Sequence, residues 1–395
     1  GRTLAVGYAD GVVRILTRCK DGLQLRTALK PHTVAISAIE YAPDGAHLAT
    51  GAVDGCVFFL SLKHGQYAPI GFMKGATASA ITSMVWSDEA TLLVGYADGT
   101  CVELSLPTEP DTSETYELPY DGAAFDFSPI VEARRAAAKK AKEALKALEP
   151  VAPAPAPEEV DPFAPPAEEV EPEPEEEEPD LDAGSVLALL PIKDNKVNKS
   201  FYVSFEKEPG LMWKVTWGSP HAVAVSRNAA AACFLSTSRS NQYFLSGGTD
   251  GSVCVSELDG DTYWQGSVHG ACNSVRAQLS FDDAYLVSAG TDGNLFVHKM
   301  ATTDQKEPIL SDMSLPTLNE AGFPGADILD ASTYSIEEAK QKTEADARAA
   351  AAEAKKLTVR ERVDDIRRRF TMLLGENTGL PKAEQLPREA FYIDP

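Results

Sequence analysis

The chain has 395 residues, of which 44% are hydrophobic, so it is long enough for two or three domains with packed cores. Its formal net charge is −23, and over half of this excess lies between Pro157 and Asp182, where thirteen residues are acidic and none is basic. This balance argues against nucleic acid or a membrane as the main partner. The six cysteines include no CxxC pair, which favours reduced thiols over a disulfide framework.

The N-terminal end of the sequence starts within a strand pattern. Gly1 is followed almost at once by the apolar run that begins at Leu4, so we expect the chain to be a segment of a longer polypeptide. No apolar run of about 18 residues and no secretory signal is visible in the sequence.

One sequence motif recurs along the chain: an apolar strand, a small turn residue, Asp-Gly and a second apolar strand. It occurs five times, at Leu4–Leu16, Leu48–Leu60, Leu92–Leu104, Phe244–Ser256 and Leu286–His298. Three of the four intervals between its aspartates are 44, 44 and 42 residues. Asp-Gly favours a tight turn between paired strands, and a period of about 40–45 residues is typical of WD-repeat propeller blades.

The repeat predicts an all-β fold, a WD40-type β-propeller that forms the C-terminal part of a propeller array. The strand before the hairpin is also visible, for example at Ala35–Ala42 and Ile81–Ser87. Weaker strand patterns at Ser185–Ile192, Phe201–Phe205 and Leu211–Trp217 extend the count. We therefore expect about five to seven blades, carried by residues 1–129 and 184–300.

The fourth interval between the hairpin aspartates is 152 residues, because an insertion at 130–183 interrupts the repeat. Its first part, Ile130–Glu149, is rich in Ala, Lys, Glu and Arg and predicts a basic helix. Its second part, Pro150–Asp182, combines ten prolines with the acidic residues and predicts an extended, unpacked linker. Two interpretations stay open, a tolerated loop insertion and a docking arm that acts through its charge.

A long helix is predicted near the C-terminus, after a connector at 301–333. Ser335 and Glu338 have the spacing of a capping box, and Gly375 is expected to end the helix, so that it covers 334–375 and a tail follows at 376–395. Five apolar residues follow a 4-3-4-3 spacing and share one helix face: Val359, Val363, Ile366, Phe370 and Leu373. This face predicts an interface, either in a short coiled coil or in a lone helix docked in a groove.

Several polar residues have the spacing of the hydrogen-bonded network that often braces WD-type blades. The network joins a His before the first strand, a Ser or Thr on the next strand and the Asp of the hairpin. The candidate braces are Asp10, Asp54, Asp98, Asp250, Asp292, His32, Thr50, His269 and Ser288. The usual Trp after the turn is absent from all five hairpins. We predict a structural role for these residues, through charge-assisted hydrogen bonds, and no catalytic one.

The motifs of common enzymes are missing from the sequence. It contains no Gly-Lys pair for a phosphate loop, no G-x-S-x-G elbow and no H-E-x-x-H or Cys/His cluster. We therefore predict a protein that is not an enzyme, with no catalytic, metal-binding or cofactor-binding residues.

Two segments resemble one protein family in their local amino-acid sequence. Lys30–Leu60 carries a whole blade, and Thr333–Ala347 carries the junction between propeller and helix. Both are similar to the long WD-repeat proteins of the axonemal tether and tether-head complex of cilia and flagella, of which two sibling members compete as the nearest match. The resemblance covers nearly all of the chain outside 130–182, whereas the insertion and the missing blade tryptophans depart from it.

The family resemblance implies a structural scaffold in the ciliary axoneme. The implied partners are inner-arm dynein heavy chains, the sibling tether/tether-head WD-repeat protein and the tubulin of the doublet microtubule. The implied role is to link the motor heads of the two-headed inner-arm dynein to the doublet and so regulate ciliary beating. The alternative is a general WD-repeat adaptor, either a substrate receptor of a ubiquitin ligase or a trafficking-coat subunit.

Overall fold

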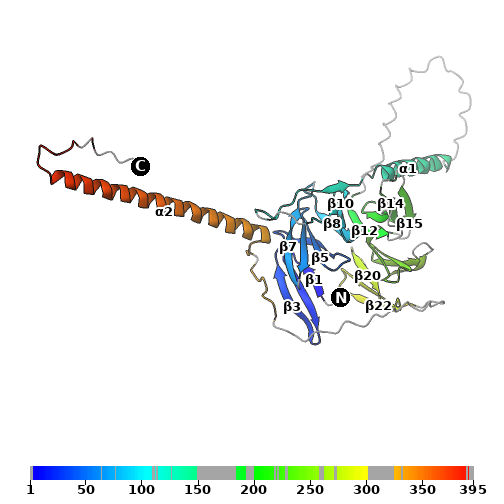
Figure 1. The fold of residues 1–395 in the computed structure, drawn as a ribbon. Helices are drawn as coiled ribbons and strands as arrows, with labels where there is room; N and C mark the ends of the chain where they lie inside the picture. The colour runs from blue at the N-terminus through cyan, green and yellow to red at the C-terminus, as the bar shows by residue number, and fades with distance from the viewer. Residues whose placement is uncertain are drawn as a thin grey trace, which may run out of the picture.

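The computed structural model describes residues 3–148, 184–300 and 324–390, apart from short gaps at 64, 76, 109–111, 113, 126, 193–199, 218, 220–221, 227–229, 258–261, 271–273, 331 and 388–389. Within these ranges six antiparallel sheets are arranged as the blades of a propeller, and a long helix projects from one side (Figure 1). The predicted Pro-rich linker and most of the predicted connector lie outside the described residues.

The six sheets follow one another along the chain, and the strands of each sheet are paired in sequence order. Blade 1 contains β1 (Thr3–Gly7), β2 (Val13–Cys19) and β3 (Gly22–Leu29). Blade 2 contains β4 (Ile36–Tyr41), β5 (His47–Ala52), β6 (Val57–Lys63) and β7 (Gln66–Met73). Blade 3 contains β8 (Ile81–Trp86), β9 (Thr91–Tyr96), β10 (Cys101–Ser105) and β11 (Gly122–Ala124).

The second half of the propeller resumes after the insertion. Blade 4 contains β12 (Val186–Ile192), β13 (Ser200–Phe205), β14 (Leu211–Thr216) and β15 (Ala222–Ser226). Blade 5 contains β16 (Ala232–Thr237), β17 (Tyr243–Gly248), β18 (Ser252–Glu257) and β19 (Thr262–Ser267). Blade 6 contains β20 (Val275–Leu279), β21 (Tyr285–Gly290) and β22 (Leu295–Lys299).

The Asp-Gly hairpins join the second and third strands in blades 2, 3, 5 and 6, and the first two described strands, β1 and β2, in blade 1. Their glycines have φ near +80°, a conformation that residues with a Cβ rarely adopt. Space is equally restrictive at some of them, because a Cβ on Gly11 would lie 2.1 Å from the His32 carbonyl oxygen and one on Gly251 would lie 1.9 Å from the His269 carbonyl oxygen. The glycine is therefore required both by the turn and by the neighbouring loop.

The hydrophobic core is divided into five clusters, each of which lies between two consecutive blades. Between blades 2 and 3, for example, Val57 and Phe59 pack against Ile81 and Leu92. Alternate residues of a strand point to opposite faces, so each blade contributes to the cluster before it and to the one after it. A blade cannot bury both faces alone, which is why stacking of the blades stabilises the fold.

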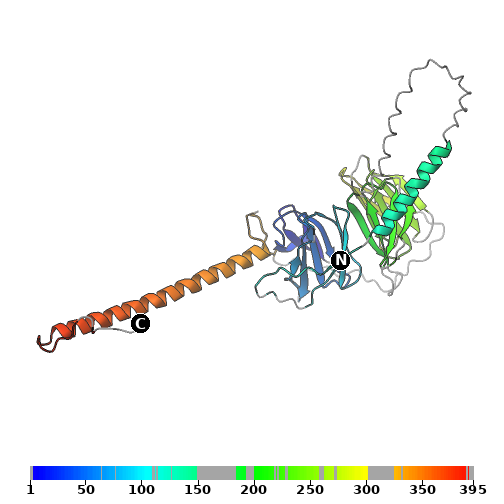
Figure 2. The same ribbon diagram turned by 90° about the horizontal axis from the view of Figure 1, so that it is seen from above.

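Two helices leave the propeller, α1 (Ser128–Leu148) and α2 (Ile336–Thr378). Helix α1 starts just before the insertion and lies beside blade 4, and α2 extends away from blades 1 and 2 (Figures 1 and 2). The expected end of α2 at Gly375 is wrong, because the helix passes through this residue and its C-cap is Gly379. A single glycine in an exposed helix costs only about 1 kcal/mol, which the flanking residues can offset. Neither helix is apolar enough over a sufficient length to cross a membrane, as far as the described residues extend.

Candidate interaction sites on the propeller and its helices

The hairpin aspartates that the sequence assigns to a bracing network each accept a hydrogen bond within their own turn. In all five hairpins the Asp Oδ1 accepts a hydrogen bond from the backbone amide two residues later, at distances of 2.9–3.1 Å. Asp98 and Asp250 also accept a hydroxyl hydrogen bond of 2.6 Å from the residue at that same position. Each of these carboxylates therefore closes its own turn, and none of them converges with another on a shared pocket.

The two candidate histidines are buried beside their strands, but only one contacts its hairpin aspartate. Nδ1 of His269 lies 3.0 Å from Oδ1 of Asp292, and its Nε2 lies 3.1 Å from the Ser288 hydroxyl. His32 instead pairs with Thr50, with Nε2 2.8 Å from the hydroxyl oxygen. Burial lowers the pKa of His32 to about 4, against opposing effects of Asp54 and the Thr50 carbonyl. His32 is therefore neutral at pH 7.

The base of α2 is fixed to the loop that leads into blade 2. Ser335 is buried and forms the predicted capping box, in which its hydroxyl accepts from the Glu338 amide and the Glu338 carboxylate accepts from the Ser335 amide at 2.8 Å. The Ile336 amide donates to the Lys30 carbonyl at 2.8 Å, and Lys30 Nζ donates to the Thr333 carbonyl at 2.8 Å. These bonds fix the direction in which the helix leaves the propeller.

A second set of contacts holds the first turn of α2 against the segment 112–118. The carboxylate of Glu337 accepts from the Tyr116 amide and from the Thr115 hydroxyl, both at 2.8 Å. Partial burial acts to raise the pKa of Glu337, but these hydrogen bonds outweigh it and hold that pKa below its ordinary value. Lys340 lies over the Tyr116 ring, 4.2 Å from its centroid, and donates to the Thr112 carbonyl.

The segment that contacts α2 is itself tied to the propeller. The Phe72 amide donates to the Tyr116 carbonyl and the Leu118 amide donates to the Phe72 carbonyl, both at 2.8 Å, so this segment adds to the outer edge of β7. The chain before α2 is held in the same way to blade 1, where Arg14 donates to the Asp327 carboxylate at 2.8 Å. The helix base therefore contacts both blades 1 and 2.

Beyond its base, α2 contains no buried residue. The predicted apolar face lies on this free part: Val359 is 61% exposed, Val363 and Leu373 are each 39% exposed, and Ile366 and Phe370 are half-buried by the helix itself. The structure brings these five side chains to no other described element. A face of this kind is available to a partner helix.

Helix α1 is held to blade 4 by a buried cluster that the sequence analysis did not find. Ile130 is fully buried, and Arg134 forms an ion pair with Glu208, which also accepts from Trp213 Nε1 at 2.7 Å. The Arg134 guanidinium lies 5.1 Å from the centroid of the Phe205 ring. The first two turns of the predicted basic helix are therefore packed onto the propeller.

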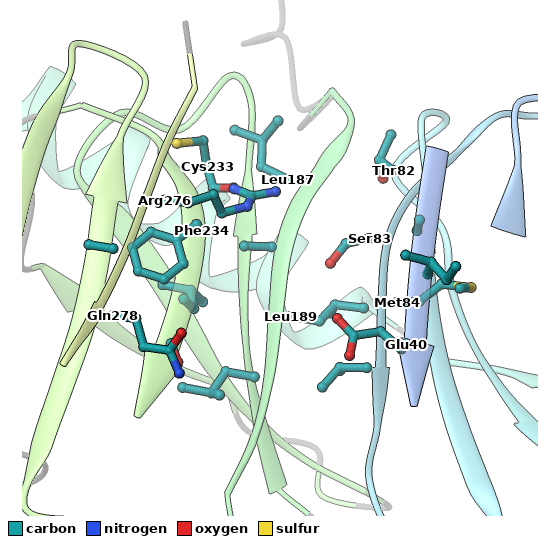
Figure 3. A pocket seen from close by; sticks show the side chains of 18 of the residues that line it. Glu40, Thr82, Ser83, Met84, Leu187, Leu189, Cys233, Phe234, Arg276 and Gln278 are labelled. Carbon is teal, nitrogen blue, oxygen red and sulfur yellow. The ribbon is translucent and has the colours of Figure 1, made fainter. Parts of the chain in front are cut away.

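A channel with both polar and apolar walls runs between the innermost strands and has a volume of about 1000 Å³. It is lined by residues of β4, β8, β12, β16 and β20, among them Glu40 and Arg276 on opposite walls (Figure 3). The Glu40 side chain opens to the channel, and desolvation by the strands around it raises its pKa to about 7, against the opposing charge of Arg276. The groups are spread around the wall and do not form a catalytic arrangement, and no cluster of three metal-ligating side chains occurs among the residues described.

Some of the contacts described above had signals in the sequence that could have been used. The pattern Phe125-Asp126-Phe127 before the basic helix places two aromatic residues where they can pack beside it, and Phe127 indeed lies against Phe205 with ring centroids 5.5 Å apart. A lone Glu208 between two strands gave no such signal, because only the folded structure brings it to Arg134.

The fold and these sites define a WD-repeat β-propeller protein with a projecting helix. The family model for the WD domain, G-beta repeat, matches residues 22–59. A chain in the crystal structure of the mitotic checkpoint complex aligns with a TM-score of 0.50 and 13% identity, over 76% of this chain and 72% of that one, which supports the fold alone. The predicted WD40-type propeller is therefore confirmed.

At the level of the individual protein, the chain is similar to cilia- and flagella-associated protein 44. It is 29% identical to that protein from Chlamydomonas reinhardtii over 469 residues, which cover 100% of this chain and 26% of the relative. It is also 29% identical to the Mus musculus protein over 482 residues, covering 99% of this chain and 24% of the relative. The predicted resemblance is confirmed, and the chain spans about a quarter of the length of these curated relatives.

Proposed function

We propose that this protein is a non-enzymatic structural scaffold of the ciliary or flagellar axoneme. The observation that carries the proposal is the similarity along the whole chain to two proteins named as cilia- and flagella-associated. The propeller supplies a rigid body, and WD-repeat propellers commonly present their rims to other proteins. The polar clusters at the hairpins and at the helix bases are compatible with this role, since they stabilise turns and hold the helices to the propeller.

The finer role is that of a tether and tether-head component. In this role the protein links the motor heads of the two-headed inner-arm dynein to the doublet microtubule and so regulates ciliary beating. Its partners are the dynein heavy chains, a sibling WD-repeat protein and tubulin. The support is the family resemblance of the blade at Lys30–Leu60 and of the helix junction at Thr333–Ala347.

The attachment of α2 suggests different roles for its two ends. A helix that is fixed at its base on blades 1 and 2 and free along the rest can transmit force between the propeller and whatever binds its far end. A 43-residue helix spans about 65 Å at 1.5 Å per residue. The apolar face from Val359 to Leu373 lies in its far half, which is where we place the contact with a partner helix.

The experiment replaces the endogenous protein in a flagellated cell by a tagged full-length version that carries Val363→Glu and Ile366→Glu. We expect a charged apolar face to abolish pairing, so that incorporation into isolated axonemes falls at least tenfold and the dynein heads lose their attachment in tomograms. The matched control is Arg368→Ala, on the opposite face of the same helix, which should incorporate normally.

Three outcomes would contradict the proposal in different ways. Normal incorporation of the Val363→Glu, Ile366→Glu protein would overturn the role of the helix face. Loss of the variant from axonemes, with the dynein heads still attached and normal beating, would overturn the tether role but leave the axonemal scaffold. A tagged wild-type protein found on vesicles or in the cytosol, with no axonemal signal, would favour a general WD-repeat adaptor.

A further inference from the structure

The channel between the inner strands carries two opposite charges that form no ion pair with each other. Among the residues that line it, only Glu40 and Arg276 are formally charged, and they lie on opposite walls (Figure 3). The rest of the lining consists of neutral polar groups and apolar side chains. A cavity of this kind recognises a ligand that has a charged group as well as an apolar part.

The pairing of the inner strands shows which side chains share one level of the channel. The residues four positions before the hairpin aspartates of blades 2, 3, 5 and 6 are paired with Ile39, Met84, Leu235 and Ala277. These four side chains belong to the apolar clusters between the blades. Because side chains alternate along a strand, the next residue of each strand points into the channel. This level, called the Glu40 level below, contains Glu40, Val85, Ser236 and Gln278.

Arg276 lies at a second level, two residues before Gln278 on β20. Its counterparts on the other inner strands are Ala38, Ser83 and Phe234. Two residues of a strand separate the levels by about 7 Å. The Arg276 guanidinium is held at its own level, because its Nη1 donates to the Cys233 carbonyl at 2.7 Å and it lies 5.9 Å from the centroid of the Phe234 ring.

The carboxylate of Glu40 is left without a direct partner. Its backbone carbonyl accepts from Trp86 Nε1 at 3.3 Å, but the carboxylate accepts no hydrogen bond from the residues that the structure describes. The strands around it restrict its contact with water and supply no donor in return, which is why its pKa is raised. The other side chains of the Glu40 level are neutral, so a cation at this level would find a carboxylate that is free to pair with it.

We propose that the channel binds a polypeptide segment of a partner protein that inserts one basic side chain, Lys or Arg, beside Glu40. The oxygens of Ser236 and Gln278 at the same level would accept the N–H donors that Glu40 does not use. Val85 completes this level with apolar surface, which suits the methylene stem of either side chain.

Arg276 determines what else the ligand must contain. Its guanidinium repels a lone cation, so the cation has to come with an acceptor that meets Arg276 one level away. A polypeptide provides such an acceptor in the main-chain carbonyl next to the basic side chain, whereas a metal ion or a small amine does not. The volume of about 1000 Å³ is also far larger than a single cation requires. The proposal concerns this channel and does not depend on the axonemal role.

The test measures the binding of four dye-labelled peptides to the purified, full-length protein by fluorescence anisotropy. The peptides have the sequence Gly-Ala-X-Ala-Gly, where X is Arg, Lys, Ala or Glu. We expect the Arg and Lys peptides to bind at least tenfold more tightly than the other two. Glu40→Gln should abolish this preference, and the matched control is Glu89→Gln, which makes the same change at an exposed turn outside the channel and should bind as the wild type does.

Gln278→Lys is a second test, which leaves Glu40 in place. It introduces a cation of the chain itself at the Glu40 level, so the Arg and Lys peptides should again bind at least tenfold more weakly. An unchanged midpoint of urea denaturation shows that the variant is folded, and a folded variant that binds these peptides as the wild type does would contradict the proposal.

Three further results would overturn the proposal. Equal binding of the Arg peptide to Glu40→Gln and to the wild type would exclude Glu40 as the partner of the cation. Failure of all four peptides to bind the wild type would mean that the full-length protein leaves no room for a peptide in the channel. Competition by methylguanidinium at the same concentration as the unlabelled Arg peptide would assign the site to a small cation.

Discussion

The two helices of this protein are attached to the same propeller by different chemistry. Helix α1 is held by side chains that are largely removed from water, namely Ile130 and the Arg134–Glu208 ion pair under the aromatic rings of blade 4. Helix α2 is held mostly by partly buried hydrogen bonds, from the Ile336 amide to the Lys30 carbonyl and from the Tyr116 amide and Thr115 hydroxyl to the Glu337 carboxylate.

This difference predicts how strongly a substitution at each helix base affects stability. A buried ion pair stabilises little in net terms, but removing one partner leaves an uncompensated charge in a poor solvent. Hydrogen bonds at a partly exposed junction are replaced by water at lower cost. Substitutions at the base of α1 should therefore destabilise the protein as core substitutions do. Substitutions at the base of α2 should have smaller, local effects.

The largest effect is expected from Arg134→Ala. It would leave the buried Glu208 without its cation and remove the packing over Phe205. We expect a loss of about 3 kcal/mol in the free energy of unfolding, measured by denaturation in urea, together with faster hydrogen exchange in the first turns of α1.

Two further variants separate the effect of the unpaired charge from that of lost packing. Arg135→Ala removes the neighbouring, exposed arginine and should change the stability by less than about 0.5 kcal/mol. Combining Arg134→Met with Glu208→Gln removes both charges and should recover most of the loss. A double variant as unstable as Arg134→Ala would show that packing, and not the unpaired charge, determines the effect.

The next effect comes from His32, which is buried beside Thr50 of blade 2. Its pKa is about 4 in the folded protein and 6.5 as a free side chain, so between these values the unfolded chain binds a proton that the folded chain does not. Stability is therefore lost as the pH falls from about 6.5 towards 4. At pH 5 we expect a loss of about 2 kcal/mol relative to pH 7.

The variant His32→Gln isolates this contribution. Glu40 acts in the opposite sense, because its raised pKa of about 7 means that stability is lost as the pH rises through the same range. The informative quantity is hence the difference in slope between wild type and variant, obtained from urea denaturation at pH 5, 6 and 7. Parallel curves for the two proteins would contradict a neutral, buried His32.

The sequence was sufficient to predict the fold class, for a definite physical reason. A blade hairpin needs glycine at positive φ and apolar residues at alternate positions, and both requirements are local, so the repeat of Asp54-Gly55 and its equivalents reveals them. The capping box at Ser335 is local in the same way. The end of α2 was misplaced because a glycine is permitted within an exposed helix as well as at its end.

The attachment sites could not be predicted, because their partners are distant in the chain. Glu337 contacts Tyr116, which is 221 residues away, and Arg134 contacts Glu208, which is 74 residues away. Neither pair follows a spacing rule, and no local propensity marks a carboxylate that will be buried. The exposure of Leu4 and Leu295 could likewise not be predicted, since both residues match the apolar positions of the repeat.

A smaller effect is expected from Glu337→Gln, which tests the hydrogen bonds at the base of α2. The amide keeps one acceptor oxygen but loses the charge that strengthens the bonds from Tyr116 and Thr115. We expect the first turn of α2 to open more easily by about 1 kcal/mol, seen as roughly fivefold faster amide exchange at Tyr116 and Ala339. The exposed Glu344→Gln on the same helix is the control, and an equal acceleration in both variants would contradict a specific clamp.

The smallest effect concerns the far end of α2. Gly375 lies within the helix, and a Cβ added there would meet no other atom within 4 Å. Gly375→Ala should thus remove the entropic cost of glycine without a clash and stabilise the last turns by about 0.5–1 kcal/mol, detected as slower exchange at Gly379, whose amide donates to the carbonyls of this turn. If the substitution instead frayed the helix before Thr378, Gly375 would be a helix end in solution, and the free part of α2 would be shorter by a turn.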